Sequence, residues 1–312
     1  MGIPIPVLLN NLVGLFLLLG AGFASAKLKF VSDAATAHFT ALLMKVTLPA
    51  TLFTAMLRPF DAAFLRDSVI IFLVGLFLFL GFALLCVPAS RLFRVKEGGR
   101  GMWMICCTFC NNGFMGYPVI LALFGEDGLA LAAMMGISFN LLVYTLGAKQ
   151  VLLDAEPGQS VTLSWKKLIF TGVNGATALG VVFFCLQIQV PAAILTPLQH
   201  LANITTPLSM FLIGMTLARG SLSAAFRERD VFSACFMRLL ALPVLSWAVL
   251  KLLPIENPLI PWVVLITMAM PAPAISGVLA EQYGCNTKLS AQIVFLSSLL
   301  CIVTIPLVAM LP

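Results

Sequence analysis

The sequence predicts an all-α membrane protein with ten transmembrane helices in two inverted repeats of five, residues 1–155 and 156–312. Of its 312 residues, 61% are hydrophobic and 10% are charged, whereas soluble domains carry about 25% charged residues. A soluble fold of this length could not bury so much apolar surface, so lipid must be the solvent. The spacing of the charges and a weak internal repeat then predict the number and arrangement of the helices.

Charged residues divide the chain into apolar segments, each close to the ~20 residues that cross a bilayer. No cation precedes the first segment, so we expect it to be a retained span and not a cleaved signal peptide. The spans are expected at residues 4–26, 34–57, 68–90, 101–123, 128–148, 168–188, 196–218, 231–250, 260–282 and 289–311.

The cations fall mainly on one set of loops. The loops after odd-numbered spans hold 13 Lys and Arg residues, and the other loops hold 3. Because cytoplasmic loops are enriched in cations, we expect the odd-numbered loops in the cytoplasm and both termini outside. The predicted location is the plasma membrane, as a multi-pass protein (in a bacterium, the inner membrane).

Two predicted spans are interrupted. The stretch Gly101 to Gly125 has no Asp, Glu, Lys or Arg, yet its middle, Asn111 to Pro118, is poor helix sequence. Aligning the two halves sets this middle against Pro271 to Gly277, which is also broken by proline and glycine. Paired interruptions at matching places in two repeats are typical of the substrate site of a secondary transporter.

The prolines of these stretches predict where each helix restarts. Proline lacks an N–H group and suits the first turn of a helix, so we expect Pro118 and Pro273 each to begin a second half-helix. The free N–H groups and partial positive charges at two such starts can bind an anion, with amide donors added by Asn111 and Asn112. The alternative is that the prolines, including Pro271, only kink two packed helices.

Several motifs resemble those of the auxin efflux carrier family, which includes plant auxin exporters and bacterial malonate and malate permeases. The motifs are Asn111-x-x-x-Met115-Gly116-x-Pro118, Leu48-Pro49-x-x-x-Phe53, Tyr144-Thr145-Leu146, Phe211-x-x-Gly214-Met215-x-Leu217-Ala218 and Met270-Pro271. The resemblance implies a fold similar to that of bile acid symporters and sodium–proton antiporters, in which broken helices 4 and 9 cross. It also implies a scaffold of spans 1, 2, 6 and 7, a mobile unit of spans 3–5 and 8–10 that moves like an elevator, and a homodimer.

The same resemblance assigns roles by position. Asn111 matches the asparagine that holds a substrate carboxylate at the crossing, and Thr51 matches a pocket position on span 2. Asn140 and Tyr144, one helical turn apart on span 5, are implied to line the pocket as well. Hydrogen bonding between helices is the alternative role for Asn140 and Tyr144.

Two cations lie within predicted spans. Lys45 falls near the middle of span 2, where a cation costs ~3 kcal/mol or more, so we expect it to face the protein interior beside Pro49. It could hold substrate or be a structural lysine. Arg238 lies nearer the end of span 8, and we expect it to reach toward the membrane surface as a structural residue. No Asp or Glu lies deep in any predicted span, which favours an anion as cargo.

Other chemistries have little support. Cys106, Cys107 and Cys110 could suggest a metal cluster, but they lie on one apolar segment without His or carboxylate partners, which favours packing. His38 and His200 belong to no recognisable catalytic motif, so an enzyme is not expected. No metal, cofactor or nucleic-acid partner is predicted.

We therefore predict a secondary transporter of small organic anions, mono- or dicarboxylates such as malonate, malate or auxin-like acids, embedded in membrane lipid. The alternatives are an anion-binding membrane sensor and a cation-coupled symporter of the bile acid type.

Overall fold

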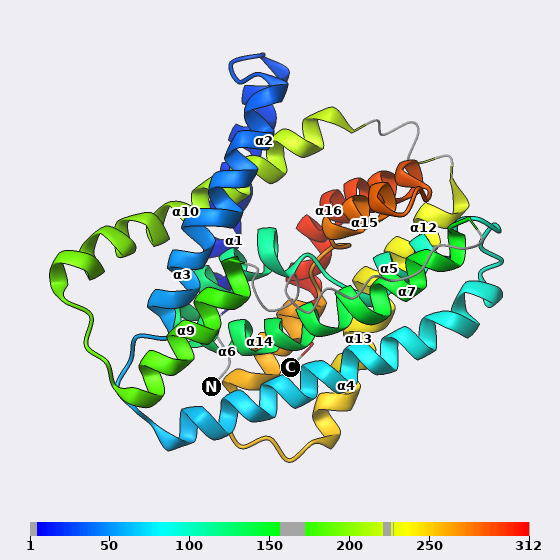
Figure 1. The fold of residues 1–312 in the computed structure, drawn as a ribbon. Helices are drawn as coiled ribbons and strands as arrows, with labels where there is room; N and C mark the ends of the chain where they lie inside the picture. Colours follow the sequence, from blue (N-terminus) through cyan, green and yellow to red (C-terminus); the bar gives the residue numbers. More distant parts are fainter. Residues whose placement is uncertain (1–4, 157–171, 221–225, 227, 312) are drawn as a thin grey trace. The chain divides into compact units, whose positions relative to one another are not determined.

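The computed structural model describes residues 5–156, 172–220, 226 and 228–311, and within these ranges the chain is helical, without β-strands (Figure 1). The α-helices are α1 (Ile5–Lys27), α2 (Asp33–Leu42), α3 (Leu48–Ala55), α4 (Ala62–Leu92), α5 (Arg100–Thr108), α6 (Tyr117–Leu142), α7 (Ala148–Val151), α9 (Gly172–Leu186), α10 (Ala192–Arg219), α12 (Arg229–Phe236), α13 (Leu242–Leu252), α14 (Leu259–Met268), α15 (Ile275–Gln282) and α16 (Thr287–Val308). Wider π-helical turns form η1 (Leu43–Thr47), η2 (Asn112–Gly116), η3 (Val143–Gly147) and η5 (Met237–Ala241), and a 3-10 turn forms η4 (Leu152–Asp154). The prediction of an all-α chain is confirmed for the described residues.

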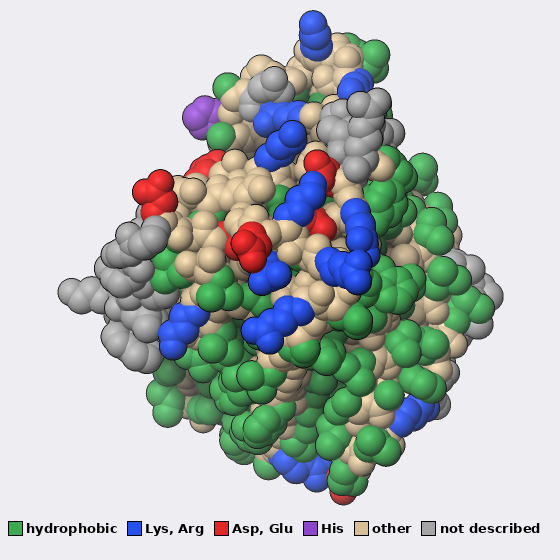
Figure 2. Space-filling model, turned by 90° about the vertical axis from the view of Figure 1, so that its right-hand side faces the viewer, with side chains coloured by type: hydrophobic (Ala, Val, Ile, Leu, Met, Phe, Trp, Pro, Cys, Tyr) green, Lys and Arg blue, Asp and Glu red, His purple; other side chains and the backbone are tan. Residues whose placement is uncertain are grey.

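The long helices have the length and composition of membrane spans. Among the described residues, the helical stretches that are long and apolar enough to cross a bilayer are Ala62–Leu92, Arg100–Asp154, Ala192–Arg219, Arg229–Leu252 and Thr287–Val308. Large apolar side chains such as Phe77 and Leu84 on α4 are 67% and 74% exposed, and apolar side chains cover much of the face in Figure 2. Such a surface suits contact with lipid. A multi-pass membrane protein is thus supported, while the ten inverted spans stay a prediction.

The observed helices overlap the predicted segments but do not keep their bounds: α4 extends beyond 68–90 at both ends, and α6 runs from the segment 101–123 into the segment 128–148. The segment 4–26 falls on α1, and 196–218 falls on α10. The segment 168–188 is occupied by α9 from Gly172, but its first residues, 168–171, lie outside the described residues. The proposed division of the chain at 155/156 adjoins 157–171, also outside them, and stays a prediction.

The chain forms two compact units, each built from three separated segments. Unit 1 comprises Met1–Phe72, Gly113–Ile137 and Trp165–Arg219, and unit 2 comprises Leu73–Asn112, Ser138–Ser164 and Gly220–Pro312. The chain passes from unit 2 to unit 1 between Asn112 and Gly113, inside the interrupted stretch that the sequence singles out.

In unit 1, glycines let α1 and α10 approach closely. A Cβ atom added at Gly22 would collide with the backbone of Phe211, and one added at Gly214 would collide with the backbone of Leu19. In a membrane no hydrophobic effect drives helices together. Small residues at the contact let the backbones approach closely, so that van der Waals packing can stabilise the pair. The Phe211-x-x-Gly214 motif therefore has a packing role.

In unit 2, polar contacts fix α5 among its neighbours. The Trp103 indole Nε1–H donates to Ser233 Oγ on α12, 2.9 Å away. At the start of α5, Asp154 Oδ2 accepts a hydrogen bond of 2.8 Å from the Met102 N–H. A carboxylate at this place stabilises the helix because the first N–H groups lack partners and carry partial positive charge.

Candidate functional site

Both interrupted stretches are interrupted in the structure, as the sequence predicted. The first half-helix, α5, ends at Thr108, and Phe109 takes an extended conformation with φ −103° and ψ 158°. In the second stretch, α14 ends at Met268 and α15 begins only at Ile275. Each stretch therefore contains non-helical backbone, which inside a membrane must be buried in protein or line a cavity.

Within unit 2 the two interruptions contact each other. The Asn111 N–H donates to the carbonyl oxygen of Pro271 over 2.8 Å. The next N–H, of Ala272, donates to Ser297 Oγ on α16 at 3.0 Å. Asn111 and Asn112 are only 7% and 2% exposed. The irregular backbone of two segments that are distant in sequence is thus hydrogen-bonded inside the protein. Two asparagines lie where the segments meet.

Pro118 and Pro273 both lie within two residues of an observed helix start. α6 begins at Tyr117, directly after the π-helical η2, so buried Pro118 is its second residue and lies in its first turn. Pro273 precedes Ala274, the N-cap of α15, and its carbonyl accepts hydrogen bonds from the Ser276 N–H and Oγ. The start expected at Pro118 is therefore one residue after that of α6, and the start expected at Pro273 is two residues before that of α15, because the sequence does not reveal whether a proline joins the first turn or the loop before it.

Asn140 and Tyr144 lie on the following part of unit 2 and are each half-buried. Asn140 is near the end of α6, and Tyr144 is within the π-helical η3. The neighbouring Phe139 ring lies 5.7 Å from that of Phe109, centroid to centroid. This ring contact places the end of α6 beside Phe109, two residues before Asn111. A pocket role for Asn140 and Tyr144 stays a prediction.

In unit 1, Thr51 takes part in helix packing. Its hydroxyl lies 2.6 Å from Thr205 Oγ1 on α10, with Thr51 3% exposed and Thr205 1% exposed. The hydroxyl also donates to the Thr47 carbonyl at 2.8 Å. These contacts show a hydrogen bond between α3 and α10, and a role in holding substrate stays a prediction.

Lys45 and Arg238, the two cations within predicted spans, each lie in the kind of environment expected for the other. Lys45, in η1, is exposed, so our expectation that it faces the interior is wrong for this structure. Arg238, in η5, is 0% exposed, so our expectation that it reaches the membrane surface is also wrong. Distance along a span can be read from the sequence, but the direction of a side chain depends on its neighbours and on the π-helical turn.

Arg238 binds main-chain carbonyls. Its Nη1 donates to the carbonyls of Cys107 and Thr108 over 2.9 and 3.3 Å, and its Nη2 donates to the carbonyl of Met268. Thr108 and Met268 are the last residues of α5 and α14. One buried guanidinium therefore caps the first half-helices of both interrupted stretches.

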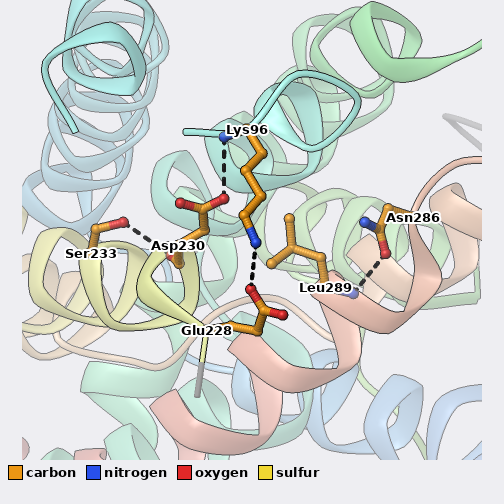
Figure 3. Close-up of polar contacts among 6 residues, drawn as sticks. All are labelled: Lys96, Glu228, Asp230, Ser233, Asn286 and Leu289. Atoms are coloured by element: carbon orange, nitrogen blue, oxygen red, sulfur yellow. Dashed lines mark hydrogen bonds and ion pairs between the residues drawn. The ribbon is translucent and has the colours of Figure 1, made fainter. Parts of the chain in front are cut away.

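A second polar cluster in unit 2 lies where the chain enters α5, α12 and α16 (Figure 3). Lys96 Nζ contacts Glu228 Oε2 at 2.9 Å, and the Lys96 N–H donates to Asp230 Oδ2 at 3.2 Å. Asn286 Oδ1 caps α16 by accepting from the Leu289 N–H at 3.0 Å. These residues line a cavity of about 220 Å³.

The charges of this cluster stabilise one another. The hydrogen bond to Glu228 and its negative charge raise the pKa of Lys96. The same contact lowers the pKa of Glu228. At neutral pH, Lys96 and Glu228 therefore form an ion pair between the loops before α5 and α12.

A metal site was looked for among the side chains that the structure describes. Over residues 5–156, 172–220, 226 and 228–311, no group of three or more His, Cys, Asp or Glu side chains is placed to hold a metal ion. Cys106, Cys107 and Cys110 are buried free thiols.

Comparisons with known proteins converge on transport. A family model described as "Membrane transport protein" matches residues 7–309. The chain is 26% identical over 271 residues to an uncharacterized transporter from Methanocaldococcus jannaschii, covering 85% of this chain and 86% of that protein. It is 25% identical over 266 residues to an uncharacterized transporter from Methanothermobacter thermautotrophicus, covering 85% of each chain.

Proposed function

Because this chain belongs to the membrane transport protein family, that of the auxin efflux carriers, we propose that it is a secondary transporter of small organic anions. The substrates are mono- or dicarboxylates such as malonate, malate or auxin-like acids. The anion binds at the interrupted stretches and is exposed alternately to each side of the membrane.

The hydrogen bond between the Asn111 N–H and the Pro271 carbonyl carries this proposal. It supports a site built from both interruptions, because broken helices that meet within a transporter form its substrate site. The buried Asn111 and Asn112 side chains can donate amide hydrogens to a carboxylate. The N-terminus of α15 is the positive end of its helix dipole, which also favours a bound carboxylate.

The pocket and the motion complete the proposal. Asn140 and Tyr144 would complete the substrate pocket. Movement would follow the elevator arrangement that the family resemblance implies, in a homodimer in the plasma membrane with both termini outside.

Flux of radiolabelled malonate and malate into proteoliposomes tests the function. Asn111→Asp keeps the size of the side chain but places a carboxylate where the anion should bind, so we expect uptake to fall to background. Asn257→Asp, in the loop before α14, keeps the Oδ1 that accepts from the Leu259 N–H. It is the matched control and should keep wild-type uptake. Equal uptake by both variants would remove Asn111 from the site.

The same preparation separates the alternative functions. A sensor would bind the anions, seen as a raised thermal midpoint, without any flux. Uptake that strictly follows a sodium gradient would instead favour the cation-coupled symporter.

A further inference from the structure

Arg238 has an unusual set of partners for a buried cation. Its side chain is 0% exposed, and its guanidinium donates to the carbonyls of Cys107, Thr108 and Met268. In the described part of the chain, no carboxylate forms an ion pair with it. A lone buried charge is costly unless its surroundings compensate it, so the carbonyls must supply the compensating negative charge.

Helix geometry explains why these carbonyls can do so. The last carbonyls of a helix lack N–H partners and carry a partial charge of about −0.5. Arg238 bonds the C-terminal residues of two helices, Thr108 of α5 and Met268 of α14. Two such ends together offer about one negative charge, which matches the single positive charge of a guanidinium.

The helix C-termini that Arg238 binds are of a kind that can also coordinate cations. In transporters with discontinuous helices, unwound carbonyls and half-helix C-terminal ends coordinate the coupling Na⁺ or H⁺. Here the chain's own guanidinium already binds the two half-helix ends. A sodium ion placed there would lose these oxygen ligands to Arg238 and would be repelled by its charge.

The local sequence accommodates the arginine through a wide helical turn. Arg238 lies in the π-helical η5, and Pro243 follows in the first turn of α13. Proline has no N–H to donate to the turn before it, which makes an extra residue tolerable there. π-Helical turns of this kind are frequent at functional sites.

We propose that Arg238 is a built-in cation of the crossing, and that it makes anion transport independent of Na⁺. This inference rests on the proposed function. Arg238 acts as a positioning residue: its charge holds together the two half-helix ends, Thr108 of α5 and Met268 of α14, which lie three residues before Asn111 and Pro271.

The first test replaces sodium with choline on both sides of proteoliposomes that contain the wild-type protein. Initial uptake of the transported carboxylate should stay unchanged. Strict dependence of wild-type uptake on Na⁺ would overturn the inference while leaving the transport function intact. Absence of both uptake and binding for every carboxylate would instead count against the proposed function.

Variants test the role of the charge. Arg238→Lys keeps the charge with fewer donors and should lose about tenfold in uptake or less, whereas Arg238→Met leaves both helix ends uncompensated and should lose about a hundredfold or more. Uptake by Arg238→Met should recover in part when Na⁺ or millimolar guanidinium is added. Lys251→Met, at an exposed cation near the end of α13, is the matched control and should show neither loss nor recovery.

A binding measurement covers the case in which Arg238→Met does not fold. The thermal midpoints of the wild-type protein and of Arg238→Lys should be the same in sodium and in choline, because the cation site is occupied in both. A rise specific to Na⁺ in the wild-type protein would show that sodium binds despite Arg238 and would overturn the inference.

Discussion

The Asn111 N–H and the Pro271 carbonyl oxygen form a hydrogen bond of 2.8 Å between backbone segments 160 residues apart. The bond uses only main-chain atoms, so the Asn111 side chain is not needed to make it. Asn111 therefore has two separable roles: its backbone joins the interruptions, and its amide is proposed to bind the anion.

Two substitutions at this position separate the roles. Asn111→Ala keeps the N–H, so its thermal midpoint without ligand should fall less than that of Asn111→Pro. Its affinity for the carboxylate should fall about 10- to 100-fold, as expected for the loss of a hydrogen bond to a charged group. Asn111→Pro lacks the N–H and should also lower the midpoint. Thermal shift with and without malonate measures both effects, and equal midpoints for the two variants would contradict the structural role of the bond.

The interruptions were predictable from sequence because Asn, Gly and Pro act locally. The Asn, Gly and Pro residues of 111–118 make this stretch poor α-helix sequence, and the structure ends α5 at Thr108 and places a π-helical turn at Asn112–Gly116. The burial of Arg238 was not predictable in this way. Its partners, Cys107 and Met268, come from segments far away along the chain, and no periodicity shows which way a side chain points from a π-helical turn.

The π-helical turns themselves also escaped prediction. Lys45, Asn112 and Tyr144, three residues singled out from sequence, lie in η1, η2 and η3. Such a turn differs from an α-helix by a shift of hydrogen bonds, which leaves the pattern of apolar residues almost unchanged. Only the nearby prolines, such as Pro49 after η1, gave a signal that could have located some of them.

The hydroxyls of Thr51 and Thr205, 2.6 Å apart, should couple in a double-mutant cycle. Each single change to valine should destabilise the protein by about 0.5–1.5 kcal/mol, because it leaves the other hydroxyl buried without this partner. The double variant should lose less than the sum of the two single losses. Denaturant unfolding in detergent measures this, with exposed Thr216→Val on α10 as control. If Thr51→Val alone weakened anion binding, while Thr205→Val did not, Thr51 would contact substrate.

The ion pair between Lys96 and Glu228 predicts a stability profile with two limits. The lowered pKa of Glu228 means that its contribution is present above its unfolded pKa and is lost as pH falls through its folded pKa. The raised pKa of Lys96 means that its contribution is present below its unfolded pKa and is lost as pH rises through its folded pKa. The difference in thermal midpoint between wild type and Lys96→Met should therefore be constant near neutral pH and shrink in acid. In a Glu228→Gln background, the effect of Lys96→Met should change much less with pH in acid, because only the weaker charge interaction of Lys96 with Asp230 remains. An undiminished change would assign the profile to other groups.

Two glycines on α1 should respond in opposite ways to alanine. Gly22 packs against the backbone of Phe211 on α10, and an added Cβ would collide with it. Gly22→Ala should therefore push the helices apart and cost about 1–3 kcal/mol, as overpacking does elsewhere. Gly14, two turns earlier, has nothing within 4 Å of an added Cβ, so Gly14→Ala should stabilise the helix by about 0.5–1 kcal/mol through lost backbone freedom of the unfolded chain. Thermal midpoints in detergent compare the two, and a loss for Gly14→Ala as large as that for Gly22→Ala would mean that close contact between α1 and α10 is not what requires glycine.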